Sequence, residues 1–398
     1  MTELEFSIMY TSDQAVDALR LALKDFVKRH KVLVNLHVLT WDIAWSNLVK
    51  VALYKSGPDV SEIGTTWIDS FISMDVLRQF SMVEISKLGG PAAFLPSAWE
   101  SGMFGEDSRV WAIPWLGDTR VIYYRRDFLG QAGIDEPTAF STLDRFSQTL
   151  AALQQAGAPL PLAIPTAQCH PTLHVFASWV WQAGGRFISP NGKHLLLNTP
   201  AARTGIEAYF DLRRYLAPAA HNLTDSQTSE LFRQGQAAVT ISGHWTLNAI
   251  KQQDAAPEVV KNLGVAVIPG VPFVGGTDLV VWKNSRQSEA ALALVRFLTS
   301  SQVQTEVVTS QGLLPTRLEA LDAPPFTSDP HYRVISESLK TGRRFQAAYM
   351  WGLIEDKLMV TLGKIWAVLL EDPELDVDVA VAQYLSPLVA ELNHTLSS

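Results

Sequence analysis

The stretch "RVWAIPWLGDTRVIYYRRDF", residues 109–128, places a short polar segment between two apolar runs that each indicate a buried strand. The polar segment is Gly117-Asp118-Thr119-Arg120. Gly-Asp is common in turns, so Asp118 is either a turn residue or a carboxylate placed where the chain leaves one sheet for another. Arg120 either contacts a ligand or pairs with Asp118 across the turn.

Towards the N-terminus, strands and helices alternate. Strands are predicted at 5–10, 32–39 and 58–64, and helices at 13–30 and 45–57. In the first helix the apolar residues recur at helical spacing, and Ser12 is a candidate N-cap. Strand, helix, strand, helix, strand predicts parallel pairing with right-handed crossovers.

A second α/β block follows the polar segment. Helices are predicted at 142–157, 172–184, 200–216, 288–300 and 301–312, and strands at 120–124, 161–165, 265–270 and 277–282, with a short helix and a strand within 229–242. The last eighty residues are mostly helical in pattern. The predicted fold class is therefore α/β.

The composition of the chain excludes several classes of function. The 398 residues are 47% hydrophobic and 18% charged, with a formal net charge of −8 and no basic cluster, so nucleic-acid binding is not expected. No apolar run reaches the roughly 20 residues of a membrane helix. One cysteine, Cys169, excludes a disulfide framework. The start lacks the pattern of a signal peptide, so we expect either a cytoplasmic protein or one whose leader has been removed.

Tryptophans recur just after predicted strands. Polar residues or Trp follow strand ends at 11–13, 41–42, 65–67 and 243–245. Because parallel sheets bind ligands at the carboxyl ends of their strands, this pattern predicts an aromatic-lined cleft.

Five segments in sequence order resemble one family, the extracellular solute-binding proteins of ABC importers, in the maltose-binding-protein-like group (family 1) that binds sugars and oligosaccharides. The segments are "GPDVSEIGTTWIDSFISMDVL" (57–77), "WAIPWLGDTRVIYYRRDFLGQAGIDEPTAFSTLDRF" (111–146), "LFRQGQAAVTISGHW" (231–245), "IPGVPFVGGTDLVV" (268–281) and "GLLPTR" (312–317). Each alone is weak, but their order makes the resemblance specific.

The resemblance implies a two-lobe periplasmic-binding-protein fold (type II), with a mixed, mainly parallel sheet in each lobe and a ligand cleft between the lobes. It places 1–116 with 276–316 in the N-terminal lobe and 117–275 with 317–398 in the C-terminal lobe. Hinge crossovers are expected near 114–119, 272–277 and 314–320. It further implies hinge closure on a carbohydrate, delivery to ABC permease subunits, and a periplasmic or extracellular monomer without cofactor, a cell-surface lipid anchor being left open.

Sugars present hydroxyl rims and apolar faces, so their sites combine flat aromatics with forked polar groups. Trp245 matches the stacking position of the family and is the first candidate. The other predicted ligand residues are Asp118, Trp67, Trp41, Asp42, Ser12, Asp13, Thr66, Gly243, Gly276, Thr277, Trp351, Arg344 and Arg120. For the tryptophans the alternative role is core packing, for Ser12 and Asp13 it is N-capping, and for the glycines it is a hinge.

Other functions remain as alternatives. A glycoside hydrolase needs two carboxylates about 5–10 Å apart, and nothing marks Asp42 and Asp118 as such a pair. No nucleophile-elbow, P-loop or zincin motif occurs, so catalysis is not expected. His170 and His174 have zinc-like spacing, but Pro171 intervenes and no metal is predicted. A sensory binding protein, or the same fold with glycerol phosphate, a polyamine or a peptide as solute, stays open.

Overall fold

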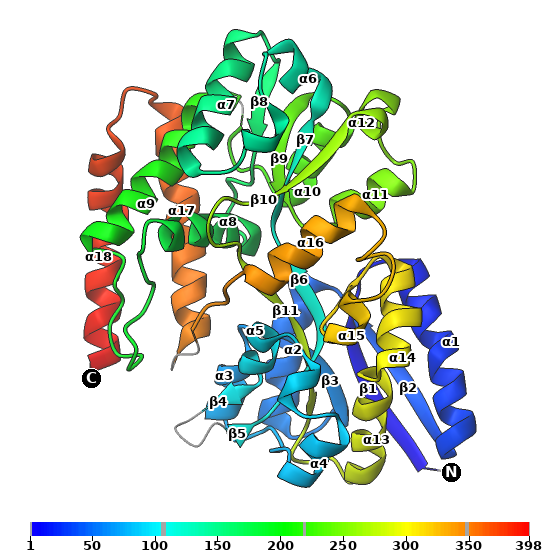
Figure 1. Cartoon of the computed structure of the whole chain (residues 1–398). Helices are drawn as coiled ribbons and strands as arrows, with labels where there is room; N and C mark the ends of the chain where they lie inside the picture. Colours follow the sequence, from blue (N-terminus) through cyan, green and yellow to red (C-terminus); the bar gives the residue numbers. More distant parts are fainter. Residues whose placement is uncertain (1, 105–108, 218–219, 347–349, 398) are drawn as a thin grey trace. The chain divides into compact units, whose positions relative to one another are not determined.

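The computed structural model describes residues 2–104, 109–217, 220–346 and 350–397. It divides the chain into two compact units, each assembled from two stretches of sequence (Figure 1). Unit 1 comprises Met1–Asp118 with Val274–Asp329, and unit 2 comprises Thr119–Phe273 with Pro330–Ser398. The chain therefore changes unit three times.

The first two changes of unit fall within the expected crossovers, but the third falls after Asp329, beyond the expected 314–320. The reason is Arg317, whose Nη2 donates to the Leu88 carbonyl at 2.6 Å and whose guanidinium lies 4.7 Å over the Phe94 ring. These contacts hold the segment after the short strand β12 (Leu314–Pro315) in unit 1.

Unit 1 is built on a six-stranded sheet of order β12-β6-β11-β3-β1-β2. Its strands other than β12 are β1 (Thr2–Met9), β2 (Val32–Leu39), β3 (Val60–Gly64), β6 (Ile113–Thr119) and β11 (Val274–Val281), with a separate small pair β4 (Met103–Phe104) and β5 (Arg109–Val110). β1 is parallel to both β2 and β3, as predicted, and β11 is antiparallel to β3.

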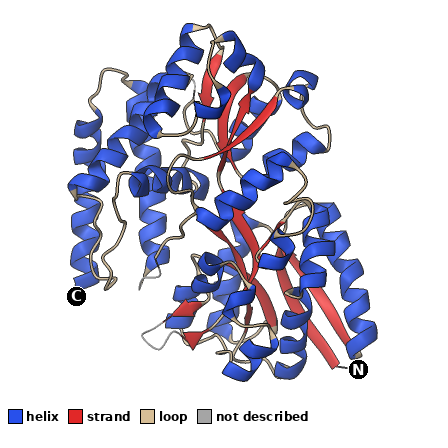
Figure 2. Ribbon diagram, viewed as in Figure 1, coloured by secondary structure: helices blue, strands red, loops and turns tan. Residues whose placement is uncertain are grey.

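Helices cover both faces of the unit 1 sheet (Figure 2). They are α1 (Asp13–His30), α2 (Trp41–Tyr54), α3 (Ile68–Ser73), α4 (Met82–Lys87), α5 (Pro96–Ser101), α13 (Ser288–Leu298), α14 (Ser301–Val303) and α15 (Leu318–Leu321). The predicted stripe of α1, from Val16 to Phe26, is buried, which confirms its amphipathic pattern.

Helix α2 begins at Trp41, four residues earlier than the predicted start at Trp45. Thr40 is extended, and its carbonyl accepts a hydrogen bond from the Ala44 N–H at 3.0 Å. Trp41 and Asp42 therefore occupy the first helical turn, where a carboxylate interacts favourably with the helix dipole.

Unit 2 is built on a four-stranded sheet of order β10-β7-β9-β8. Its strands are β7 (Val121–Arg125), β8 (Leu160–Ala163), β9 (Ala237–Ser242) and β10 (Leu263–Val267). β8 and β9 are parallel, but β7 is antiparallel to β9 and β10, so this sheet is mixed without being mainly parallel.

The helices of unit 2 outnumber its strands. They are α6 (Arg126–Gln131), α7 (Leu143–Gln155), α8 (His170–Gln182), α9 (Pro200–Phe210), α10 (Asp225–Arg233), α11 (His244–Lys251), α12 (Pro257–Lys261), α16 (Pro330–Thr341), α17 (Trp351–Glu371) and α18 (Val377–Ser397). Trp179 and Trp181 on α8 are buried, as predicted for core residues.

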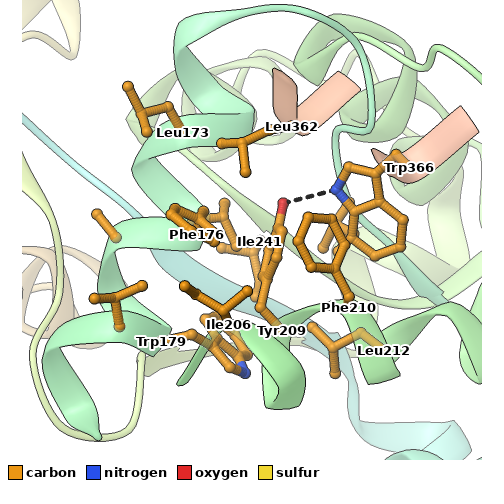
Figure 3. Packing of buried hydrophobic residues seen from close by; sticks show 14 of the residues in the cluster. Leu173, Phe176, Trp179, Ile206, Tyr209, Phe210, Leu212, Ile241, Leu362 and Trp366 are labelled. Atoms are coloured by element: carbon orange, nitrogen blue, oxygen red, sulfur yellow. Dashed lines mark hydrogen bonds between the residues drawn. The ribbon is translucent and has the colours of Figure 1, made fainter. Parts of the chain in front are cut away.

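Aromatic rings fill the contact between α8, α9 and α17 (Figure 3). Tyr209 lies edge-on to Phe176 at 5.4 Å between ring centroids and to Trp366 at 5.2 Å. The Trp366 indole N–H donates to the Tyr209 hydroxyl at 3.1 Å, so both polar atoms are satisfied within the core. This cluster gives α8 a rigid base.

Candidate functional site

In unit 1 the predicted residues meet at the carboxyl edge of the sheet. The parallel strands β1, β2 and β3 all end there, and the antiparallel β11 begins there, with Thr277 opposite Gly64. Backbone bonds join the strand ends: the Thr65 N–H donates to the Gly276 carbonyl at 3.1 Å. Residues distant in sequence are thereby gathered at one edge, as the parallel arrangement predicts.

Two tryptophans at this edge form an edge-to-face pair. The rings of Trp41 and Trp67 lie 5.7 Å apart at 65°, and the ring of Trp45 lies 5.5 Å from that of Trp67. Trp67 is only 7% exposed, whereas Trp41 is 47% exposed. Trp67 therefore packs inside unit 1, and Trp41 is the ring of this pair that solvent reaches.

The polar residues of the same edge have different surroundings. The Ser12 hydroxyl caps α1 by accepting from the Ala15 N–H at 3.2 Å, which confirms its capping role. Asp13 is exposed and accepts a hydrogen bond from the Tyr10 hydroxyl at 3.3 Å. Asp42 is also exposed, and Thr66 is half-buried. These side chains retain hydrogen-bonding capacity towards a solute.

The crossover residues lie at the ends of their strands. Asp118 is half-buried near the end of β6, and Gly276 lies near the start of β11 with a φ of 134°. Thr277 is buried beside Glu62, a carboxyl in β3 that accepts from the Met9 N–H at 2.6 Å. Burial raises the pKa of Glu62 to about 7, although the hydrogen bond from the Met9 N–H partly opposes this.

In unit 2 the site is built around the end of β9. Trp245 follows it in the first turn of α11, and its indole N–H donates to the Asp225 carboxylate at 2.6 Å. The Ser242 hydroxyl donates to the same carboxylate at 3.0 Å. A Cβ on Gly243 would lie 2.2 Å from the indole, so only glycine lets the ring fold back over the backbone. Trp245 is thus held in one orientation and left half-buried.

Arg120 extends this arrangement. Its guanidinium is buried, lies 4.8 Å from the centre of the Trp245 ring, and donates through Nη2 to Nδ1 of His174 at 2.8 Å. Burial, followed by the positive charge of Arg120, holds the pKa of His174 well below its usual value. His174 is therefore a neutral acceptor, and a cation–π contact supports the indole from behind.

Trp351 and Arg344 lie in a different environment. Trp351 begins α17 and is 2% exposed, with its ring 4.8 Å from that of Phe345. Arg344 is half-buried and donates through Nη1 to the Phe345 carbonyl at 3.0 Å. Within unit 2 the Trp351 ring belongs to the aromatic core.

Sequence reasoning missed two acidic residues of unit 2. Asp225 anchors Trp245 but is twenty positions away, and no local pattern marks it. Glu355 is buried on α17 with Oε2 3.6 Å from Nε2 of His170. Its position four residues after Trp351 places both on one helix face, a signal that could have found it.

The structure offers no metal centre among the residues it describes: no three His, Cys, Asp or Glu side chains gather at metal-binding distance. The rings of His170 and His174 lie 6.1 Å apart, and His174 is turned to Arg120. In the same described ranges, no helix is both long and apolar enough to cross a bilayer.

Comparison with known proteins places the chain in a family. A family model described as bacterial extracellular solute-binding protein matches residues 22–334. The chain therefore belongs to the bacterial extracellular solute-binding protein family, and the predicted membership is confirmed.

Relatives and solved structures agree with this placement. A binding protein of Brucella abortus is 23% identical over 297 residues, which cover 72% of this chain and 69% of the relative. The diacetylchitobiose-binding protein DasA of Streptomyces coelicolor is 25% identical over 313 residues, covering 75% and 70%. The sugar-binding protein MalE of Xanthomonas citri superposes with a TM-score of 0.83 at 22% identity, covering 100% of this chain and 98% of MalE. The predicted two-lobe α/β fold class is therefore confirmed.

Proposed function

We propose that this protein captures a sugar or oligosaccharide. The observation that carries the proposal is Trp245, a half-buried indole fixed by Asp225 and supported by Arg120. A flat indole with its N–H already satisfied offers a face rather than an edge, and sugar C–H surfaces stack on such faces. Burial of apolar area contributes roughly 25 cal/mol per Å² to such a contact.

Unit 1 carries a second group of candidate ligand residues. Its exposed Trp41, the carboxylates of Asp13 and Asp42, and the hydroxyls of Ser12 and Thr66 lie at one edge of the sheet. Carboxylates accept charge-assisted hydrogen bonds from sugar hydroxyls. Asp118, Gly276 and Thr277 stay predicted ligand residues on the same unit. In unit 2 the predicted ligand residues are also Arg120, Gly243, Trp351 and Arg344. Of all these residues, Trp67, Arg120 and Trp351 act indirectly, through the rings that they pack against.

Sugar capture is also what the relatives suggest. DasA is described as binding diacetylchitobiose, and MalE of Xanthomonas citri as a sugar-binding protein. We infer a role as the binding component of an ABC importer, acting without catalysis as a monomer outside the cytoplasm and delivering its solute to a membrane permease after hinge closure. An uptake assay in cells lacking the gene, complemented by the wild type or by a Trp245→Ala variant, separates transport from sensing.

A thermal-shift panel tests the binding proposal directly. The probes are maltose, maltotriose, cellobiose and diacetylchitobiose, with glycerol 3-phosphate and spermidine as the non-sugar arms. Binding to the native state raises the melting temperature by mass action. A shift with one or more saccharides supports sugar capture, whereas a shift confined to the non-sugar probes would replace the sugar by that solute class. Release of shorter saccharides during incubation would instead indicate a hydrolase.

A further inference from the structure

A histidine and a buried glutamate form a pair in unit 2 that the proposed sugar contacts leave unused. His170 begins α8, and Glu355 lies one turn after the start of α17. The side chain of His170 is 41% exposed, whereas that of Glu355 is 1% exposed, with 3.6 Å between Nε2 and Oε2. The carboxylate thus lies behind an imidazole that solvent can reach.

His170 offsets the cost of burying the carboxylate of Glu355. Its Oε1 atom is buried and has no hydrogen-bond partner in the described ranges of the chain. An ionised carboxylate without hydrogen bonds is costly to bury unless a cation lies beside it. Among the described residues, Nε2 of His170 is the basic group at ion-pair distance. The pair is therefore most stable with His170 protonated.

The charges around His170 favour that state. Burial lowers the pKa of His170, but the carboxylate of Glu355 at ion-pair distance, with the charge of Asp356, outweighs burial and raises it. The groups facing it are Glu355 and Asp356 from α17, His174 from α8, and Arg120 before β7, which lowers the pKa. His174 stays neutral, so of these two histidines His170 is the one that gains a charge as the pH falls.

A chain of side-chain contacts connects His170 to Trp245, the first proposed sugar contact. Its ring lies 6.1 Å from that of His174, which accepts from Arg120 at 2.8 Å, and Arg120 lies 4.8 Å over Trp245. All of these side chains belong to unit 2. No hydrogen bond of the described residues uses Nδ1 of His170, so this nitrogen remains available while Nε2 faces Glu355.

We propose that His170 contacts the captured sugar by donating from Nδ1 to an acceptor oxygen, and that Glu355 is the positioning residue that keeps the imidazole oriented and protonated. The inference rests on the proposed function and adds to it a pH dependence. The sugar is an uncharged one, because the carboxylate already neutralises the imidazolium. Affinity is highest with His170 protonated and falls as the pH rises through its pKa.

Calorimetric titration of the full chain between about pH 5.5 and 8.5 tests this, using maltose, cellobiose and diacetylchitobiose as probes. The wild type binds its best saccharide about tenfold more tightly at the acid end, as expected when a neutral hydrogen bond becomes charge-assisted. His170→Asn keeps a donor near the Nδ1 position and loses the pH step. Glu355→Gln moves the step to lower pH. Glu371→Gln, an exposed carboxyl change on the same helix, is the matched control and keeps the wild-type profile.

A second readout does not need a sugar. The imidazole C–H resonances of His170, assigned by their absence in His170→Asn, report its pKa in the free protein. Glu355→Gln lowers that pKa if the pair exists, and an unchanged value would overturn the positioning role.

The outcomes separate the two proposals. If no saccharide binds the wild type at any pH, the proposed function fails and this inference fails with it. If saccharides bind with a Kd that is independent of pH, or if His170→Asn retains the wild-type profile, the proposed function stands and only the role of His170 is lost.

Discussion

The indole N–H of Trp245 donates to the carboxylate of Asp225 at 2.6 Å, although the two residues are twenty positions apart in the chain. This bond uses the polar edge of the ring inside unit 2. The guanidinium of Arg120 lies 4.8 Å from the centre of the same ring. The hydrogen bond therefore holds the indole of Trp245 in one orientation after the end of β9.

Replacing Trp245 by alanine should abolish the saccharide-induced thermal shift and leave the melting temperature of the free protein within a few degrees. The ring is half-buried, so its loss removes the stacking surface and only part of a core contact. Differential scanning fluorimetry measures both quantities. Trp366→Ala is the control, because that ring is fully buried and its removal should lower the melting temperature of the free protein strongly. A normal shift in Trp245→Ala would contradict the stacking role.

Glu62 should make the stability of unit 1 depend on pH. Its pKa is about 7 in the folded state and 4.5 in the reference state, so the folded protein binds the proton more tightly. The corresponding stability is complete below about pH 4.5 and is lost as the pH rises to about 7, amounting to about 3 kcal/mol. Urea unfolding at a series of pH values measures this.

Glu62→Gln cannot titrate, so its unfolding midpoint should vary less across that range and exceed the wild-type value above pH 7. Glu3→Gln, which changes an exposed carboxyl of the same unit, should follow the wild type. Parallel pH profiles for Glu62→Gln and the wild type would show that Glu62 carries no such linkage.

Gly276→Ala should destabilise unit 1. The glycine has a φ of 134°, and an added Cβ would come within 2.0 Å of the Leu116 carbonyl oxygen, a backbone atom that cannot move aside cheaply. We expect a loss of about 2 kcal/mol or more in the free energy of unfolding, measured by urea denaturation. Gly130→Ala tests the matched case, since a Cβ there meets no atom within 4 Å and α6 continues through it. Equal stability of the two variants would refute the steric argument.

Tyr209→Phe should weaken the core of unit 2 while leaving its shape intact. The hydroxyl accepts from the Trp366 N–H at 3.1 Å, and its removal leaves that buried donor unsatisfied. The cost is about 1–3 kcal/mol, visible as a lower thermal midpoint. Tyr54→Phe removes an equivalent hydroxyl from a side chain that is 76% exposed and should change nothing. A neutral Tyr209→Phe would mean that another group takes over the donor.

The alternation of apolar and polar residues predicted most elements correctly. Helix α1 begins and ends where its cap and apolar stripe predicted, because short-range propensity and packing agree there. The start of α2 was predicted four residues too late. The helix begins after Thr40, whose side chain makes no capping hydrogen bond. The parallel character expected of unit 2 was wrong for β7, because strand direction depends on partners that are distant in sequence.

The sequence by itself determined the α/β class, the positions of tryptophans at strand ends, and the family to which the chain belongs. These follow from local periodicity and from motif order, both of which lie within short stretches of chain. Only the tertiary structure decided that Trp67 supports Trp41, that Asp225 anchors Trp245, and that Glu355 lies behind His170. Each of these relationships joins separate elements of a unit, and burial, which fixes both the exposed face of a ring and the charge of a carboxyl, arises only when those elements pack together.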